Sequence, residues 1–212
     1  MMTLNDLARK IYELTKNKIG RIVEQRIKEF KELKNKNSDE WFSELCFCIL
    51  TANSSAKLGI KIQERIGVQG FLTLSLEQLS QKLKELGHRF YSKRAKYIVE
   101  ARKYRNIKKI VEKFPNEKEA REWLVKNVKG LGYKEASHFL RNVGFDNVAI
   151  LDRHILRILH EHKLIEEIPK SLSRKRYLEI EKILEKLARK TQLTLSKLDL
   201  FLWYMKTGEV LK

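Results

Sequence analysis

Apolar residues recur at spacings of three and four along nearly the whole chain, and this periodicity constrains the fold more than any other feature. Such spacing places apolar side chains on one face of an α-helix. Near the N-terminus it is carried by Leu4, Leu7, Ile11 and Leu14, and then by Val23, Ile27, Phe30 and Leu33. Only 2 prolines occur in 212 residues, and no convincing pair of strands is evident. The sequence therefore predicts an all-α fold of about eleven helices.

Local signals predict where several of these helices begin and end. Ser75 is expected to cap a helix that stops at Gly87, and Gly144 is expected to end another. A further helix is expected over residues 54–67. Residues 147–151 are mostly apolar and lie outside any helical pattern. We therefore expect an extended segment there, leading into the next helix.

The chain is strongly basic, with 45 lysines and arginines against 27 acidic residues and a formal net charge of +18. Neutralised phosphates release condensed counterions, so an excess of this size favours a polyanionic partner. Nucleic acid is the partner expected, although a solvated basic surface also explains many such compositions.

The cysteine content is low, with only Cys46 and Cys48. Two residues apart on a helix, they point to different sides and cannot easily form a disulfide. They lie in an apolar run, so buried free thiols are expected. No cysteine spacing suits an iron–sulfur cluster or a zinc site, so no cofactor is required. Without a signal-peptide pattern or an apolar run of membrane-spanning length, we expect an intracellular, cytoplasmic protein that does not bind a membrane.

A glycine hairpin, Gly130-Leu131-Gly132, separates two predicted helices at residues 117–127 and 133–143. We expect both glycines to permit a tight turn with positive φ and a close approach to a ligand. The first amides of the second helix and the positive end of its dipole suit a phosphate. By itself, however, so short a pattern is more typical of an ordinary connection between helices.

Two further residues strengthen the case for chemistry at this hairpin. Lys134 lies in the first turn of the second helix, where the dipole favours the neutral amine that a lysine nucleophile needs. Asp152 follows the extended segment and is expected to cap the next helix. A carboxylate fixed in this way would stabilise positive charge developing at C1′ of a deoxyribose. For an isolated lysine, a solvated phosphate contact would be the ordinary role.

The hairpin, Lys134 and an aspartate ahead of Arg153-His154-Ile155 together resemble the helix-hairpin-helix (HhH-GPD) DNA glycosylase superfamily, from about residue 41 onward. The resemblance implies a discontinuous terminal lobe, residues 1–53 with 145–212, and a middle lobe, residues 54–144, that contains the hairpin motif at about 117–143. It also implies that Lys134 attacks C1′ of a flipped nucleotide, expels the base as a Schiff base forms, and cleaves the strand by β-elimination.

Within that superfamily the 8-oxoguanine branch fits best. Endonuclease III relatives carry a four-cysteine iron–sulfur loop after the active-site region, whereas this chain has no cysteine after Cys48. Adenine-removing relatives lack a lysine nucleophile. The chain length resembles the compact archaeal form, the second Ogg family. The implied partner is duplex DNA that contains 8-oxoguanine, and a monomer is the default oligomeric state. Whether the hairpin carbonyls bind a monovalent cation is left open by the sequence.

The resemblance also implies a base pocket. Phe90, in the basic run at 88–94, and Trp203 are candidates to stack on the extruded base. The terminal lysine, Lys212, would recognise the oxidised guanine, and Asp199 would accept from its N–H groups. The ordinary alternatives are core packing for the aromatic residues and a frayed end for Lys212.

The remaining candidates would contact DNA outside the pocket. Asn53 would fill the space left by the flipped base, although an N-cap role is the ordinary alternative. His154 would reach a phosphate, as would the hairpin residues Gly130, Leu131 and Gly132. Two other functions stay open: a helix-hairpin-helix glycosylase for oxidised pyrimidines or mismatched bases, and a non-catalytic helix-hairpin-helix DNA-binding module.

Overall fold

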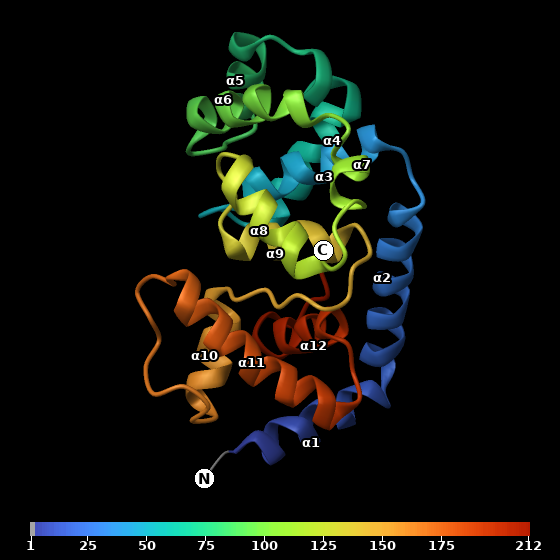
Figure 1. Ribbon diagram of the computed structural model, residues 1–212, viewed down its shortest axis with the longest axis vertical. Helices are drawn as coiled ribbons and strands as arrows, with labels where there is room; N and C mark the ends of the chain where they lie inside the picture. Colours follow the sequence, from blue (N-terminus) through green and yellow to red (C-terminus); the bar gives the residue numbers. More distant parts are fainter. Residues whose placement is uncertain (1–2) are drawn as a thin grey trace. The chain divides into compact units, whose positions relative to one another are not determined.

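The computed structural model describes residues 3–212, and over that range the chain is all-α, as the periodicity predicts (Figure 1). The helices are α1 Leu4–Thr15, α2 Lys18–Lys34, α3 Ser38–Thr51, α4 Ala56–Thr73, α5 Leu76–Glu85, α6 Tyr91–Ala101, the short 3₁₀ turn η1 Arg102–Tyr104, α7 Ile107–Val111, α8 Glu117–Asn127, α9 Tyr133–Asn142, α10 Arg153–Glu161, α11 Arg174–Thr191 and α12 Leu195–Thr207. Within this described range, no helix has both the length and the apolar character needed to cross a membrane.

The helices form two compact units. The terminal unit contains the chain up to Lys31 and from Gly144 onward, and the middle unit is Glu32–Val143. The expected boundary after residue 53 therefore falls inside the middle unit, because α3 packs there against α4, α7 and α9. The second boundary between the units lies between Val143 and Gly144.

Helix α3 forms the centre of the middle unit. Every residue from Trp41 to Thr51 is buried, which is typical of a helix covered on all faces. Its neighbours within the unit include α4, α6, α7 and α9 (Figure 1). Cys46 and Cys48 are buried in this helix as thiols and are not joined in a disulfide, as predicted. Burial raises the pKa of the Cys46 thiol well above its ordinary value.

A buried polar network joins α3 to α4 and α9. The Asn142 side-chain amide donates to Glu44 Oε1 over 2.6 Å, and Arg141 Nε donates to Asn142 Oδ1 over 3.0 Å. From α4, Gln63 Nε2 donates to Glu44 Oε2 over 3.1 Å. Since unpaired polar groups are costly in a core, these bonds specify how the three helices fit together.

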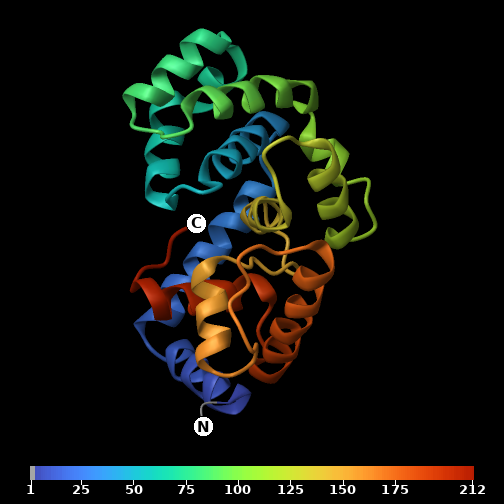
Figure 2. The same ribbon diagram turned by 90° about the vertical axis from the view of Figure 1, so that its left-hand side faces the viewer.

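In the terminal unit, α12 packs against α1, α10 and α11 (Figure 2). The segment that follows α9 is extended, as predicted, and runs to the start of α10 (Figure 1). Its first part is held by Ser196, whose hydroxyl donates to Asp146 Oδ1 over 2.7 Å and whose amide donates to Asp146 O over 3.1 Å. Lys31 also donates to Gly144 O over 2.7 Å.

Helix α4 differs from the expectation for residues 54–67. Its N-cap is Ser55, whose hydroxyl accepts from Leu58 N over 3.2 Å. Gly67 does adopt a positive φ of 69°, but it only interrupts the helix, which continues to Thr73. Ile66 and Phe71, on either side of the interruption, are both buried. Tertiary packing therefore extends a helix that the local signal would end.

Candidate functional site

The hairpin between α8 and α9 requires glycine at one of its two glycine positions. Gly130 has a φ of +91°, and a Cβ there would lie 2.6 Å from Cδ2 of Tyr97. Gly132, in contrast, has an extended backbone with φ −93° and ψ −172°, so the expectation of positive φ at both glycines was wrong. Gly132 is the N-cap of α9, and its amide donates to Glu135 Oε2 over 3.1 Å. That amide is therefore engaged by a carboxylate within the motif.

The two helices of the motif are joined by buried contacts. Leu131, at the tip, is only 6% exposed, so its side chain packs inward instead of projecting from the hairpin. Arg121 of α8 is fully buried and donates from Nη1 to Ser137 Oγ of α9 over 3.2 Å. Its guanidinium lies 5.5 Å from the centre of the Tyr133 ring. These contacts fix the start of α9 relative to α8.

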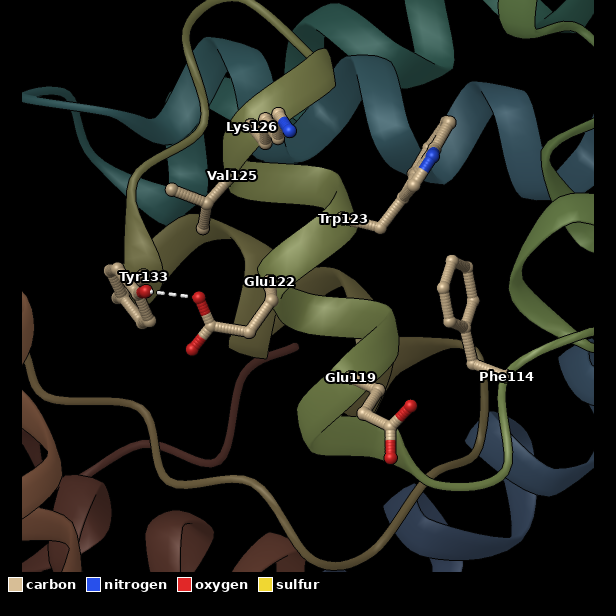
Figure 3. Close-up of a pocket in the computed structure, with 7 residues that line it drawn as sticks. All are labelled: Phe114, Glu119, Glu122, Trp123, Val125, Lys126 and Tyr133. Carbon is tan, nitrogen blue, oxygen red and sulfur yellow. Dashed lines mark hydrogen bonds between the residues drawn. The ribbon is translucent and has the colours of Figure 1, made fainter.

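A surface pocket of about 520 Å³ opens beside α8 (Figure 3), lined by Phe114, Glu119, Glu122, Trp123, Val125, Lys126 and Tyr133. The Tyr133 hydroxyl donates to Glu122 Oε2 over 2.5 Å, and the two side chains point toward one another from α9 and α8 (Figure 3). Two carboxylates disfavour a phosphate here, and none of the predicted site residues lines the pocket. The pocket matters for the site only through the Tyr133–Glu122 hydrogen bond, which anchors the residue directly before Lys134.

Lys134 is the second residue of α9, as predicted, and its side chain is 24% exposed. Its Nζ lies 3.7 Å from Glu135 Oε1, on the same glutamate that caps the helix through Gly132. A cation in the first turn is opposed by the helix dipole, and this carboxylate offsets part of that repulsion. The result is a partly shielded amine at the end of the hairpin.

Asn53 and Phe90 belong to the middle unit, in the connections that precede α4 and α6. Asn53 is exposed between α3 and α4, with φ +57°, and Ser55 rather than Asn53 caps α4. Its carbonyl accepts from Arg89 Nη2 over 3.3 Å. Phe90 is half-buried at the start of α6, with the Arg89 guanidinium 4.4 Å and the Arg94 guanidinium 5.8 Å from its ring centre. These two contacts place positive charge beside the Phe90 ring.

In the terminal unit Asp152 is the N-cap of α10, as predicted, and its Oδ1 accepts from Ile155 N over 2.8 Å. The segment before it is held by two residues of α11 that the sequence did not single out. The Tyr177 hydroxyl donates to Ala149 O over 2.7 Å and accepts from Leu151 N over 3.3 Å. Glu181 Oε1 accepts from Ala149 N over 2.9 Å. The sequence did contain a sign of this role, because Tyr177 and Glu181 are polar residues four apart on the otherwise apolar buried face of α11.

Trp203 of α12 meets His154 of α10, with ring centroids 4.8 Å apart and ring planes at 77°. Trp203 is half-buried, and its indole N–H has no hydrogen-bond acceptor within residues 3–212. Asp199, one turn earlier, is buried. After α12 the backbone turns at Gly208, with φ +72°, and the terminal residue Lys212 is half-buried. The terminal unit thus brings Asp152, His154 and Trp203 together around the start of α10.

The described residues 3–212 contain no group of three or more His, Cys, Asp or Glu side chains that could hold a metal ion.

Known proteins share both the sequence and the fold of this chain. The family model Ogg-HhH, described as 8-oxoguanine DNA glycosylase, matches residues 23–193. The 8-oxoguanine DNA glycosylase/AP lyase of Methanocaldococcus jannaschii is 63% identical over 206 residues, 97% of this chain and 99% of the relative. The enzyme of the same name from Korarchaeum cryptofilum is 53% identical over 212 residues, 100% of both. The crystal structure of the M. jannaschii enzyme with a 15mer DNA containing 8-oxoguanine superposes with a TM-score of 0.95 at 63% identity, covering 97% of this chain and 99% of that chain. The chain therefore belongs to the 8-oxoguanine DNA glycosylase family.

Proposed function

We propose that this chain removes 8-oxoguanine from duplex DNA and then cleaves the strand as an AP lyase, with Lys134 as the nucleophile. The observation that carries the proposal is the partly shielded amine in the first turn of α9, in a chain 63% identical to an enzyme named for this activity. The M. jannaschii relative was crystallised with DNA that contains the lesion, so we infer the same partner here. The net charge of +18 suits that partner.

In the proposed reaction, Lys134 attacks C1′ of a nucleotide turned out of the duplex, where the atom is otherwise unreachable. The Nζ–C1′ bond forms as the glycosidic bond breaks, and the base leaves with the bonding electrons and takes up a proton. The nitrogen loses a proton and the sugar ring opens, which gives the Schiff base. Removal of a C2′ proton then breaks the C3′–O bond and cuts the strand.

Asp152 is the proposed electrostatic partner of this step. Its N-cap bond to Ile155 and the Tyr177 contacts to the preceding backbone fix the orientation of the carboxylate. A carboxylate held in one orientation stabilises developing positive charge without having to reorganise during the reaction. We assign it to the charge at C1′ in the oxocarbenium-like transition state.

The base pocket is proposed to use aromatic faces and charged groups. Phe90 and Trp203 would stack on the extruded base, a contact worth about 1–3 kcal/mol per base. Lys212 would recognise the oxidised guanine, consistent with its half-buried side chain. Asp199 is assigned to the guanine N–H groups. Its burial means that it would act at the closed end of such a pocket.

The proposed contacts with the rest of the DNA are simpler. Asn53 stands exposed in a left-handed turn, where it can enter the space left by the base. His154 would reach a phosphate from the first turn of α10. At the hairpin, the backbone at Gly130 and Leu131 is assigned to phosphate. The Leu131 amide donates to Val128 O over 3.3 Å and the Gly132 amide to Glu135 Oε2, so either amide can bind a phosphate only by exchanging its present bond.

Borohydride trapping tests the proposal, because it reduces a Schiff base to a stable covalent link. The assay uses duplexes that carry one 8-oxoguanine, one thymine glycol or no lesion. The matched variants are Lys134→Gln and Lys129→Gln; Lys129 is 67% exposed and paired with Glu100 at 2.9 Å. Each variant removes one lysine charge near the hairpin, but only the first removes the proposed nucleophile.

We expect a covalent band on the 8-oxoguanine duplex, lost in Lys134→Gln and kept in Lys129→Gln. Strand cleavage by Lys134→Gln would contradict the choice of nucleophile. A stronger band with thymine glycol would instead indicate a glycosylase for oxidised pyrimidines. Binding without any band would indicate a DNA-binding module.

A further inference from the structure

His88 occupies an unusual position between the end of α3 and the start of α6. It is only 2% exposed. Its Nε2 lies 2.9 Å from Leu50 O, and its Nδ1 accepts from Phe90 N over 3.1 Å. One imidazole ring therefore bridges two backbone segments, and one of them carries the proposed base-stacking residue Phe90.

These two bonds require one protonation state of the ring. A carbonyl oxygen can only accept, so Nε2 must carry the hydrogen that faces Leu50. The Phe90 amide can only donate, so Nδ1 must carry none. Both bonds form together only on the neutral imidazole with hydrogen on Nε2. A second proton would sit on Nδ1, facing the Phe90 N–H group, and would break that bond.

The segment held by His88 also supports the loop that carries Asn53. Arg94 Nη2 donates to Ala52 O over 2.6 Å, and Arg89 Nη2 donates to Asn53 O over 3.3 Å. Both arginines also lie against the Phe90 ring. A shift of the backbone at residues 88–90 would therefore move the Phe90 ring and the supports of the Asn53 loop together.

The charges around the ring favour its neutral form. Burial, which disfavours the imidazolium, is the main cause that lowers the pKa of His88 from its ordinary value. The cations Arg94 on α6 and Arg89 on the adjoining loop lower it further, while the hydrogen bond to the Leu50 carbonyl at the end of α3 opposes them. The neutral ring is thus present at neutral pH, and acid is needed to protonate it.

We infer that His88 is a positioning residue for base recognition: its neutral ring holds Phe90 and the Asn53 loop in place, and its protonation releases them. The inference rests on the proposed function, since Phe90 must stack on an extruded base for its position to affect recognition. It predicts that preference for lesion-bearing DNA falls as the pH is lowered below the range in which His88 is neutral.

The test measures binding in the Lys134→Gln background, so that no chemistry occurs. Fluorescence anisotropy gives Kd for duplexes with one 8-oxoguanine or with guanine, from about pH 4 to 8, because the pKa of His88 lies below its ordinary 6.5. The ratio of the two values removes the general effect of pH on phosphate binding. Two replacements of His88 separate its two bonds. In His88→Asn, the side-chain oxygen accepts from the amide two residues on, as in an Asx-turn, at any pH. In His88→Gln, the longer amide can reach Leu50 O but places no acceptor at the δ position.

With His88 present, we expect the preference for 8-oxoguanine to fall by about five- to tenfold at the acid end, by loss of the Phe90 stack. His88→Asn should keep the preference and lose its pH dependence. His88→Gln should have the reduced preference at every pH, with a cooperative thermal transition as the check that it folds. A ratio that is independent of pH with His88 present, or the same pH dependence in His88→Asn, would overturn the inference. No preference for 8-oxoguanine at any pH would overturn the proposed function itself.

Discussion

Replacement of Tyr177 by phenylalanine tests how the fold positions Asp152. The hydroxyl donates to Ala149 O over 2.7 Å and accepts from Leu151 N over 3.3 Å, in the segment that leads directly into the N-cap of α10. Tyr177 is 1% exposed, and both of its backbone partners are buried, so water cannot replace the lost hydroxyl without rearrangement. The ring itself remains in Tyr177→Phe, so packing changes little.

The expected loss of stability follows from these two bonds. A buried polar group left without its partner costs about 1–3 kcal/mol. Tyr177→Phe leaves two such groups, Ala149 O and Leu151 N, without the hydroxyl. With partial relaxation of the backbone around them, the free energy of unfolding should fall by about 2–3 kcal/mol. With a urea m-value of about 2 kcal/mol/M, the unfolding midpoint should fall by about 1–1.5 M. A looser segment should also misplace Asp152 and slow excision by about tenfold, with little change in DNA affinity.

Urea denaturation, single-turnover excision of 8-oxoguanine and Kd for the DNA measure the three quantities. Tyr12→Phe is the matched control, because Tyr12 lies in the same unit on α1 and is 52% exposed. It should leave all three unchanged. An unshifted midpoint in Tyr177→Phe would refute the assigned bond energies. A lowered midpoint with a normal excision rate in the folded protein would refute the link between this segment and Asp152.

Three further substitutions test other parts of the structure. Gly130→Ala should lower the urea midpoint more than Gly87→Ala, because both glycines have φ near +90° but only at Gly130 does a Cβ meet another side chain; equal losses would argue against close packing at the hairpin. Asn142→Leu should cost about 2–3 kcal/mol by removing a hydrogen bond to a buried carboxylate, and thermal unfolding unchanged from the parent would contradict this. Asp39→Asn tests the pH dependence of stability. The bidentate bond from Arg105 lowers the pKa of Asp39 from its ordinary 3.8. The ion pair therefore stabilises the fold above that value, and its contribution is lost as the pH falls through the lowered pKa. Denaturation curves of parent and variant should therefore differ near neutrality and converge in acid; a constant difference would exclude the ion pair as its cause.

Local chemistry predicted several features of the fold from sequence. Ser75 caps α5 and Gly87 follows it with φ +87°, as expected. Gly144 adopts φ +90° after α9, and Asp152 caps α10. Caps and left-handed stops depend on residues within one helical turn of one another, so a short stretch of sequence contains the information.

The same local rules were wrong where packing competed with them. Gly67 has the backbone of a helix stop, yet α4 resumes because buried residues lie on both sides. Gly132 was expected to share the positive φ of Gly130. Instead it is an extended N-cap whose amide is bonded to Glu135. A glycine permits several conformations, and its surroundings decide which one is used.

The sequence by itself determined the helical class, the basic character, the hairpin before α9 and the position of Lys134 in its first turn. It left undetermined which buried polar groups meet. The contacts of Tyr177 with Ala149, of His88 with Leu50 and of Asn142 with Glu44 join residues far apart in the chain. Hydrophobic periodicity reports only which face of a helix is buried. The partner of each buried donor or acceptor is set by how the helices dock, because a buried polar group is stable only where another element brings its complement within hydrogen-bond distance.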